Sequence, residues 1–108
     1  MQIHDLSNDI GELIYSTHEF KILIESHLTY LRTTNITTTA VDQQKNYKFE
    51  GDFYGLLAEL NISKEFHYVI MRVNGYESSS DFKGDVEYIV MPDLAEVQML
   101  ANILETKK

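Results

Sequence analysis

Apolar residues recur every three or four positions over residues 6–31, in the first third of the chain. That spacing is typical of amphipathic helices. Ser16 and Glu19 form a capping box, which places a helix start inside the pattern. We therefore predict an N-terminal helical pair, with a break near residues 15–16 and a second helix that runs to about Arg32. The competing interpretation is one kinked helix.

The next stretch, residues 33–46, is polar and rich in threonine. Threonine is β-branched and disfavours helices, so we expect extended chain or loop here, with an edge strand at residues 36–41. The length of the stretch makes it a candidate for a partner-facing connection. Residues 47–49 alternate between polar and aromatic side chains and predict a short strand.

Apolar and β-branched side chains fill residues 67–73, which makes this segment the clearest predicted strand. An Asn-Gly turn signal follows it, and residues 86–91 read as a second strand. We predict a hairpin of these two segments. The polar residues 76–85 between them form either a long excursion or a small extra turn, capped by Ser80 or Asp81.

Capping residues mark the boundaries of two further helices. Asp52 starts a short helix with one apolar stripe, and Asn61 ends it in a left-handed conformation. Pro92 terminates the second hairpin strand, and Asp93 with Glu96 opens a final helix. The expected fold class is α+β, with a small, mostly antiparallel sheet and a C-terminal helix in a single domain of residues 1–108.

Composition narrows the class of protein further. The chain has 108 residues, of which 44% are hydrophobic, so it can form a packed core. It has no cysteine, which excludes disulfides and thiolate metal sites. Its net charge of −8 disfavours nucleic acid and anionic membranes as partners. We find no apolar run near membrane-spanning length and no secretory signal, so we expect a cytoplasmic protein, or one within a particle assembled there.

Residues that could carry catalytic chemistry do not form a known pattern. The five glycines are scattered, and no two of the four histidines have the helical spacing of a zinc site. His27 falls on an inward helix face, which predicts a partly buried histidine with a hydrogen-bond partner. Arg72 stands alone in an apolar segment, which predicts an ion pair with Glu87. We expect no catalytic residues, no cofactor and no metal.

Aromatic and acidic residues in the 76–85 segment form the candidate partner-binding site. It consists of Tyr76, Glu77, Asp81, Phe82 and Asp85. Tyrosine is enriched in protein interfaces, and the acidic side chains suit a basic partner. The alternative is that Tyr76 and Phe82 form a small core that holds the loop.

The favoured function is a non-catalytic protein–protein interaction domain. We expect a small structural or assembly subunit of a larger complex, for example a virion component of the phage tail or baseplate type. Its partners would be other protein subunits, and homo- and hetero-oligomers both remain open. One alternative is an acidic inhibitor or immunity-type protein that blocks a basic enzyme surface. Another is an enzyme or small-ligand binder whose site has no recognisable motif.

Overall fold

The structure, a computed structural model, describes residues 17–106. In this range two short strands are combined with six α-helices and two 3-10 helices. In chain order they are α2 (His18–Ser26), α3 (Leu28–Thr33), β1 (Thr37–Ala40), α4 (Gln43–Lys48), α5 (Phe53–Glu59), η1 (Lys64–Phe66), α6 (His67–Val73), η2 (Ser79–Asp81), β2 (Tyr88–Met91) and α7 (Leu94–Thr106). The α+β class and the C-terminal helix are confirmed.

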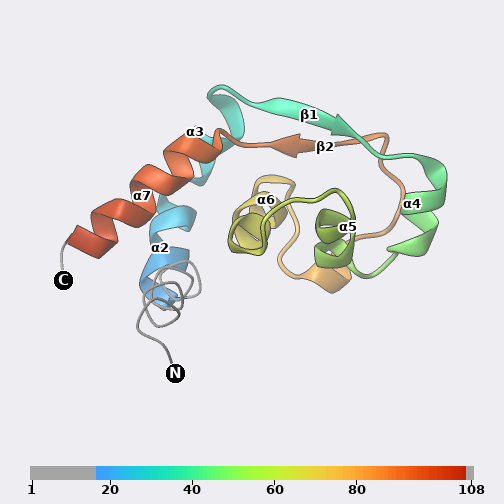
Figure 1. The fold of residues 1–108 in the computed structure, drawn as a ribbon, viewed down its shortest axis with the longest axis horizontal. Coiled ribbons are helices and arrows are strands. Elements are labelled where there is room, and N and C mark those ends of the chain that lie inside the picture. Colours follow the sequence, from blue (N-terminus) through green and yellow to red (C-terminus); the bar gives the residue numbers. More distant parts are fainter. Residues whose placement is uncertain (1–16, 107–108) are drawn as a thin grey trace.

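The two strands form an antiparallel ribbon along one side of the molecule, and the helices lie beneath it and at its ends (Figure 1). Thr37 lies opposite Met91, and Ala40 opposite Tyr88. Helices α2 and α7 pack together near one end, whereas α4 follows β1 at the other end. The predicted edge strand at residues 36–41 is therefore confirmed.

Helix α6 occupies the segment that was predicted to be a strand of the 67–73/86–91 hairpin. That prediction is wrong: residues 67–73 are helical, and β2 pairs with β1 instead. Five of the seven residues of α6 are buried, including Val69 and Ile70. A helix covered on most sides needs apolar residues all round, and a short apolar run of this kind does not distinguish a buried helix from a buried strand.

The Asn-Gly pair after α6 ends this helix and does not turn a hairpin. Gly75 has a φ of 89° and its N–H donates to the Arg72 carbonyl, while the N–H of Tyr76 donates to the Met71 carbonyl. These two bonds are the Schellman motif of a helix C-terminus. Helix α5 ends in the same way, with Asn61 at a φ of 62°, as predicted.

Two local predictions about residues 42–49 are also wrong. Residues 43–48 form α4, where a polar loop and a short strand were expected. The Asp42 side chain accepts a hydrogen bond from the N–H of Lys45 at 2.8 Å and so starts the helix. Asn46, in the middle of α4, is buried.

The N-terminal helical region is described only from residue 17. The predicted first helix, the break at residues 15–16 and Ser16 lie outside the described residues. Thr17 is the N-cap of helix α2, and its hydroxyl accepts from the N–H of Phe20. The predicted run to Arg32 is interrupted at His27, where α2 gives way to α3. The ring Nδ1 of the half-buried His27 lies 2.9 Å from the Leu23 carbonyl, so the prediction for this histidine is confirmed.

One hydrophobic cluster joins these elements. It contains Phe20 and Ile24 from α2, Phe53 and Leu57 from α5, Val69 and Ile70 from α6, Ile89 from β2, and Val97 from α7. Helix α6 packs against α3, α5 and β2, so the ribbon is held to the helical layer through this helix.

Candidate interaction surface

The backbone N–H and C=O groups of β1 point alternately toward β2 and toward the free edge of the ribbon. The N–H of Val41 donates to the Glu87 carbonyl at 2.9 Å, which fixes the side of β1 that faces β2. Because successive residues of a strand direct their N–H and C=O groups to opposite edges, Thr37 and Thr39 also face β2. The backbone groups of Thr38 and Ala40 are therefore directed outward, at the free edge of β1.

The opposite edge of the ribbon is held at two points by asparagine side chains, at Val90 in β2 and at Val86 just before it. The Asn74 amide donates to the Val90 carbonyl and accepts from the Val90 N–H, both at 2.8 Å. The Asn46 amide makes the same pair of bonds with Val86, at 2.7 and 3.3 Å. Each asparagine thus takes the place of a residue in a neighbouring strand. We call Asn46 and Asn74 the asparagine clamps.

The free edge of β1 has no such cover among residues 17–106. Strand β1 pairs only with β2 in the described part of the chain. Thr38 and Ala40 are both exposed. Residues 33–41 contain no charged residue and no proline, the residue types that commonly protect strand edges from pairing. The ribbon therefore presents one edge that the two asparagines hold and one edge that is ready to pair.

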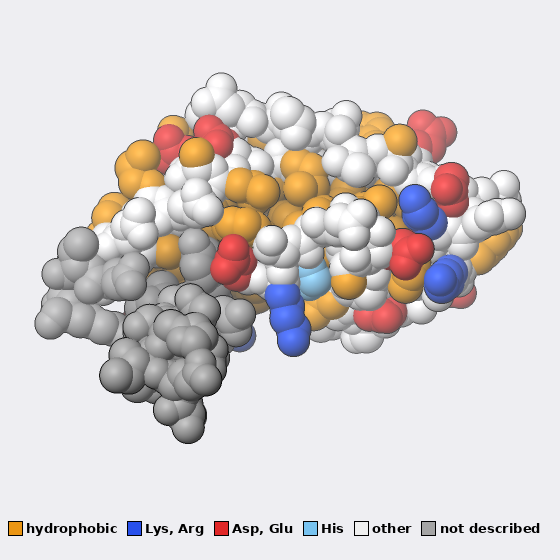
Figure 2. All heavy atoms as spheres, in the orientation of Figure 1, with side chains coloured by type: hydrophobic (Ala, Val, Ile, Leu, Met, Phe, Trp, Pro, Cys, Tyr) orange, Lys and Arg blue, Asp and Glu red, His pale blue; other side chains and the backbone are white. Residues whose placement is uncertain are grey.

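Several large hydrophobic side chains near the ribbon are exposed. Tyr88 in β2 is 54% exposed and lies opposite Ala40, and Ile36, just before β1, is 41% exposed. Tyr47 follows the clamp residue Asn46 and is 70% exposed. Along the ribbon side of the molecule, at the top of the view, Figure 2 shows hydrophobic and neutral atoms in the middle and acidic side chains near both ends.

The predicted partner-binding residues fall into two groups in the structure. Phe82 is 1% exposed, and its ring lies 5.4 Å from that of Phe53. The half-buried Tyr76 contacts both rings, at 5.0 and 5.8 Å between centroids. The small-core alternative therefore describes these two residues. Burial raises the pKa of the Tyr76 hydroxyl, with a further contribution from the charge of Asp85.

The acidic members of the predicted site, Glu77, Asp81 and Asp85, are exposed. Asp81 belongs to η2, the extra turn that was one of the two predicted alternatives for this loop. It forms a capping box with Ser78, which is the cap in place of the predicted Ser80 or Asp81. The Asp81 carboxylate accepts from the N–H groups of Glu77 and Ser78, at 3.2 and 3.1 Å. This contact orders the loop.

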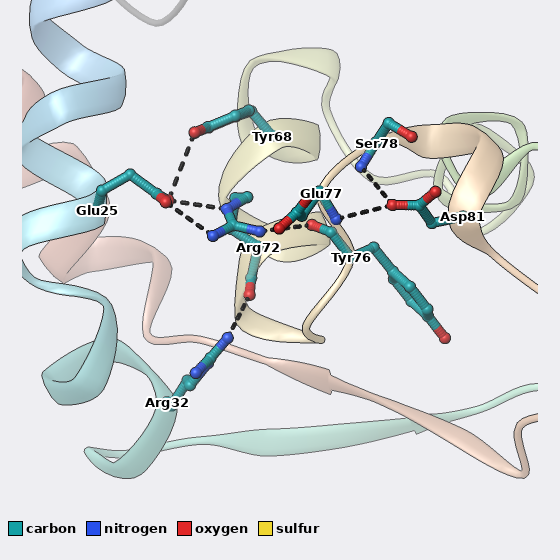
Figure 3. Close-up of polar contacts among 8 residues, drawn as sticks. All are labelled: Glu25, Arg32, Tyr68, Arg72, Tyr76, Glu77, Ser78 and Asp81. Carbon is teal, nitrogen blue, oxygen red and sulfur yellow. Dashed lines mark hydrogen bonds and ion pairs between the residues drawn. The ribbon is translucent and has the colours of Figure 1, made fainter.

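Arg72 is the centre of a polar network that links several helices (Figure 3). Its guanidinium makes a bidentate ion pair with Glu25 on α2, at 2.7 and 2.9 Å, and donates to the Tyr76 carbonyl at 3.0 Å. Arg32 on α3 donates to the Arg72 carbonyl at 3.1 Å. The predicted ion pair with Glu87 is therefore wrong. The network joins α2, α3 and α6 and requires no ligand.

Ionisation in this network follows from its contacts. The hydrogen bond from Arg72 lowers the pKa of Glu25, and the same bond raises the pKa of Arg72. Burial raises the pKa of Tyr68, and the neighbouring Glu25 carboxylate adds to the shift. These directions favour the charged forms of the ion pair at neutral pH.

Histidine and acidic side chains do not gather into a metal site within residues 17–106. The buried His67 has its ring Nε2 2.9 Å from the Ile62 carbonyl, and its ring lies against that of Tyr54. In the same range, every buried side-chain nitrogen or oxygen has a hydrogen-bond partner. None of the described helices has the length and apolar character needed to cross a membrane.

The fold and the ribbon place the chain in the class of small α+β domains with an exposed two-stranded sheet. Comparisons with protein-family models, with curated proteins and with solved structures give no match. Sequence reasoning found the edge strand but missed the asparagine clamps. The functional argument therefore depends on the geometry of the ribbon.

Proposed function

We propose that this chain is a non-catalytic protein–protein interaction domain, a small subunit that assembles with other proteins through the β1–β2 ribbon. The observation that carries the proposal is the asymmetry of the ribbon, in which two asparagines hold one edge while the edge of β1 is open. Exposed strand edges pair readily with other chains, so proteins usually protect them.

Exposed aromatic side chains support the same surface. Tyr47 follows Asn46 in α4 and Tyr88 lies two residues after Val86, so both exposed tyrosines belong to the segments that the Asn46–Val86 bonds join. Tyrosine provides a large contact area together with a polar tip, and it is enriched where proteins meet. An interface on the ribbon would bury both rings without any change in the core.

Site-specific photo-cross-linking tests this proposal. We would replace Tyr88, Tyr47 or Glu77 individually by p-benzoylphenylalanine in the full chain, expressed in the source organism, and irradiate living cells. We expect a discrete protein adduct from positions 88 and 47. Position 77 is the comparison, because Glu77 belongs to the loop site predicted from the sequence. Absence of any protein adduct from all three positions would contradict an interaction domain.

A second candidate function, an acidic inhibitor of a basic enzyme, is favoured by the exposed acidic side chains of the 76–87 segment. Glu77, Asp85 and Glu87 all face solvent. This function predicts an adduct from position 77 alone, and binding that weakens steeply as salt is raised. An assembly contact that buries the ribbon tyrosines predicts adducts from positions 47 and 88 and a weaker dependence on salt.

A further inference from the structure

The open edge of β1 also indicates how a partner would bind and which residue types it would carry. This inference rests on the proposed function. We infer that the partner adds an extended segment antiparallel to β1, with basic residues that precede an uncharged core. Strand addition of this kind takes its affinity from main-chain hydrogen bonds and its specificity from alternate side chains.

The hydrogen-bonding requirement comes from Thr38 and Ala40. Each of these residues directs one N–H and one C=O outward, because Val41 and its alternate neighbours bond to β2. An added strand would pair with these groups and leave the existing ladder intact. Antiparallel addition matches the existing pairing and is slightly more stable per residue than parallel addition.

The uncharged core of the partner follows from the side chains along the edge. Thr37, Thr38 and Ala40 are exposed and neutral, and Ala40 separates the edge from the exposed ring of Tyr88. A charged residue opposite Ala40 would lie on an apolar strip. A threonine or valine there would contact Ala40 and extend toward Tyr88.

The basic residues follow from the end of β1. Asp42 comes directly after Val41, and Val41 is hydrogen-bonded to Glu87, so two exposed acidic residues lie together where β1 ends. Lys45, the nearest base along the chain at this end, is half-buried. At the other end the exposed charge is Arg32, whereas Asp93 and Glu96 are half-buried. The N-terminal end of an antiparallel partner would meet Asp42 and Glu87, which places its positive charge there.

A second copy of this chain is a poorer occupant. Each copy has a net charge of −8, residues 33–41 carry no charge, and the base that precedes them, Arg32, already donates to the Arg72 carbonyl. Like charges held close together repel one another and suppress the wrong pairing. Self-association through β1 is therefore an outcome that the experiment must detect.

The test uses the full chain and a fluorescent peptide with two lysines followed by an alternating threonine–valine core. Binding is measured by anisotropy, and amide hydrogen exchange is followed by NMR. We expect the N–H groups of Thr38 and Ala40 to exchange at least about tenfold more slowly when the peptide binds. The N–H groups of Thr39 and Val41 should be protected already in the free protein, because they face β2.

Matched peptides separate the parts of the inference. Replacing the lysines by glutamates, or moving them after the core, should weaken binding at least about tenfold, and N-methylation of the core should abolish it. In the protein, Thr38→Pro removes an outward N–H without removing a bond to β2, whereas Thr38→Val keeps that N–H. We expect the proline variant to lose peptide binding and the valine variant to retain it.

Four results would overturn strand addition. They are no binding of the lysine peptide, equal binding of the N-methylated peptide, binding without protection of Thr38 and Ala40, and a dimer in which these amides are already protected. The N-methylated peptide acts on the unmodified chain, so the test does not depend on how the proline variant folds. If strand addition fails while position 88 still cross-links in cells, the interaction function stands and only this binding mode is wrong.

Discussion

The asparagine clamps make a quantitative prediction about stability, and Asn74→Ala is its sharpest test. The Asn74 amide makes three hydrogen bonds, one to the Ile70 carbonyl at 2.7 Å and two to the backbone of Val90. A typical intramolecular hydrogen bond contributes about 1 kcal/mol net. Water can reach part of this site, because Asn74 and Val90 are only half-buried. We therefore expect a loss of about 2–4 kcal/mol, a large share of the stability of a small domain.

Urea unfolding followed by circular dichroism measures this loss, and hydrogen exchange locates it. The Val90 N–H should exchange faster in the variant, since it loses the Asn74 acceptor. Asn74→Asp keeps an acceptor for that N–H but places a carboxylate oxygen against the Ile70 and Val90 carbonyls, so it should not recover the stability lost in the alanine variant. Asn102→Ala is the matched control: Asn102 is exposed on α7, so its replacement should be neutral or slightly stabilising. An unfolding free energy within about 0.5 kcal/mol of the unmodified chain, with Val90 still protected, would refute the clamp.

Three further changes test other parts of the fold by the same unfolding measurement. Glu25→Gln should cost about 0.5–1 kcal/mol at pH 7, because the ion pair with Arg72 is partly exposed. Since Arg72 lowers the pKa of Glu25 below its ordinary value of 4.5, this contribution is present above that value and is lost as pH falls through the pKa of the folded state. Phe82→Ala should cost about 3–5 kcal/mol, since the ring is buried. Gly84→Ala should cost about 1–3 kcal/mol more than Gly51→Ala. Both glycines have positive φ, but a Cβ only at Gly84 would meet a backbone oxygen, at 2.5 Å.

Each of these changes has an outcome that would contradict it. For Glu25→Gln, it is a difference in unfolding free energy from the unmodified chain that stays constant from neutral pH to well below 4.5. Lys83→Ala, at the exposed position next to Phe82, is the control for the aromatic deletion, and an equal cost would show that the small core contributes nothing. Equal costs for the two glycine changes would show that the contact at Gly84 relaxes freely.

Capping residues predicted helix boundaries better than propensity predicted element type. Asp52 and Asn61 bound α5 as expected, because a cap and a left-handed terminator act through neighbouring backbone groups. The opposite case is α6, whose β-branched residues favour a strand in isolation. Burial by the surrounding helices overrides that preference, and no local signal in residues 67–73 reports such burial.

The candidate surface could be predicted only in part for a related reason. The uncharged, threonine-rich sequence was enough to predict an edge strand at residues 36–41, where β1 forms. The clamps, in contrast, connect Asn46 to a residue 40 positions later and Asn74 to one 16 positions later. Nothing in the local sequence distinguishes these asparagines from ordinary turn or cap residues, so the held edge emerges only from the tertiary structure.

The order in which the two strands leave the ribosome follows from their pairing. Paired residues of β1 and β2 are 48 to 54 positions apart, so β1 is translated well before its partner exists. At about 5–20 residues per second, that interval is roughly 3–10 s. During it, β1 is a nascent segment with both edges unsatisfied. It carries no charge and no proline to block pairing, so only the polarity of its threonines limits aggregation before β2 is made.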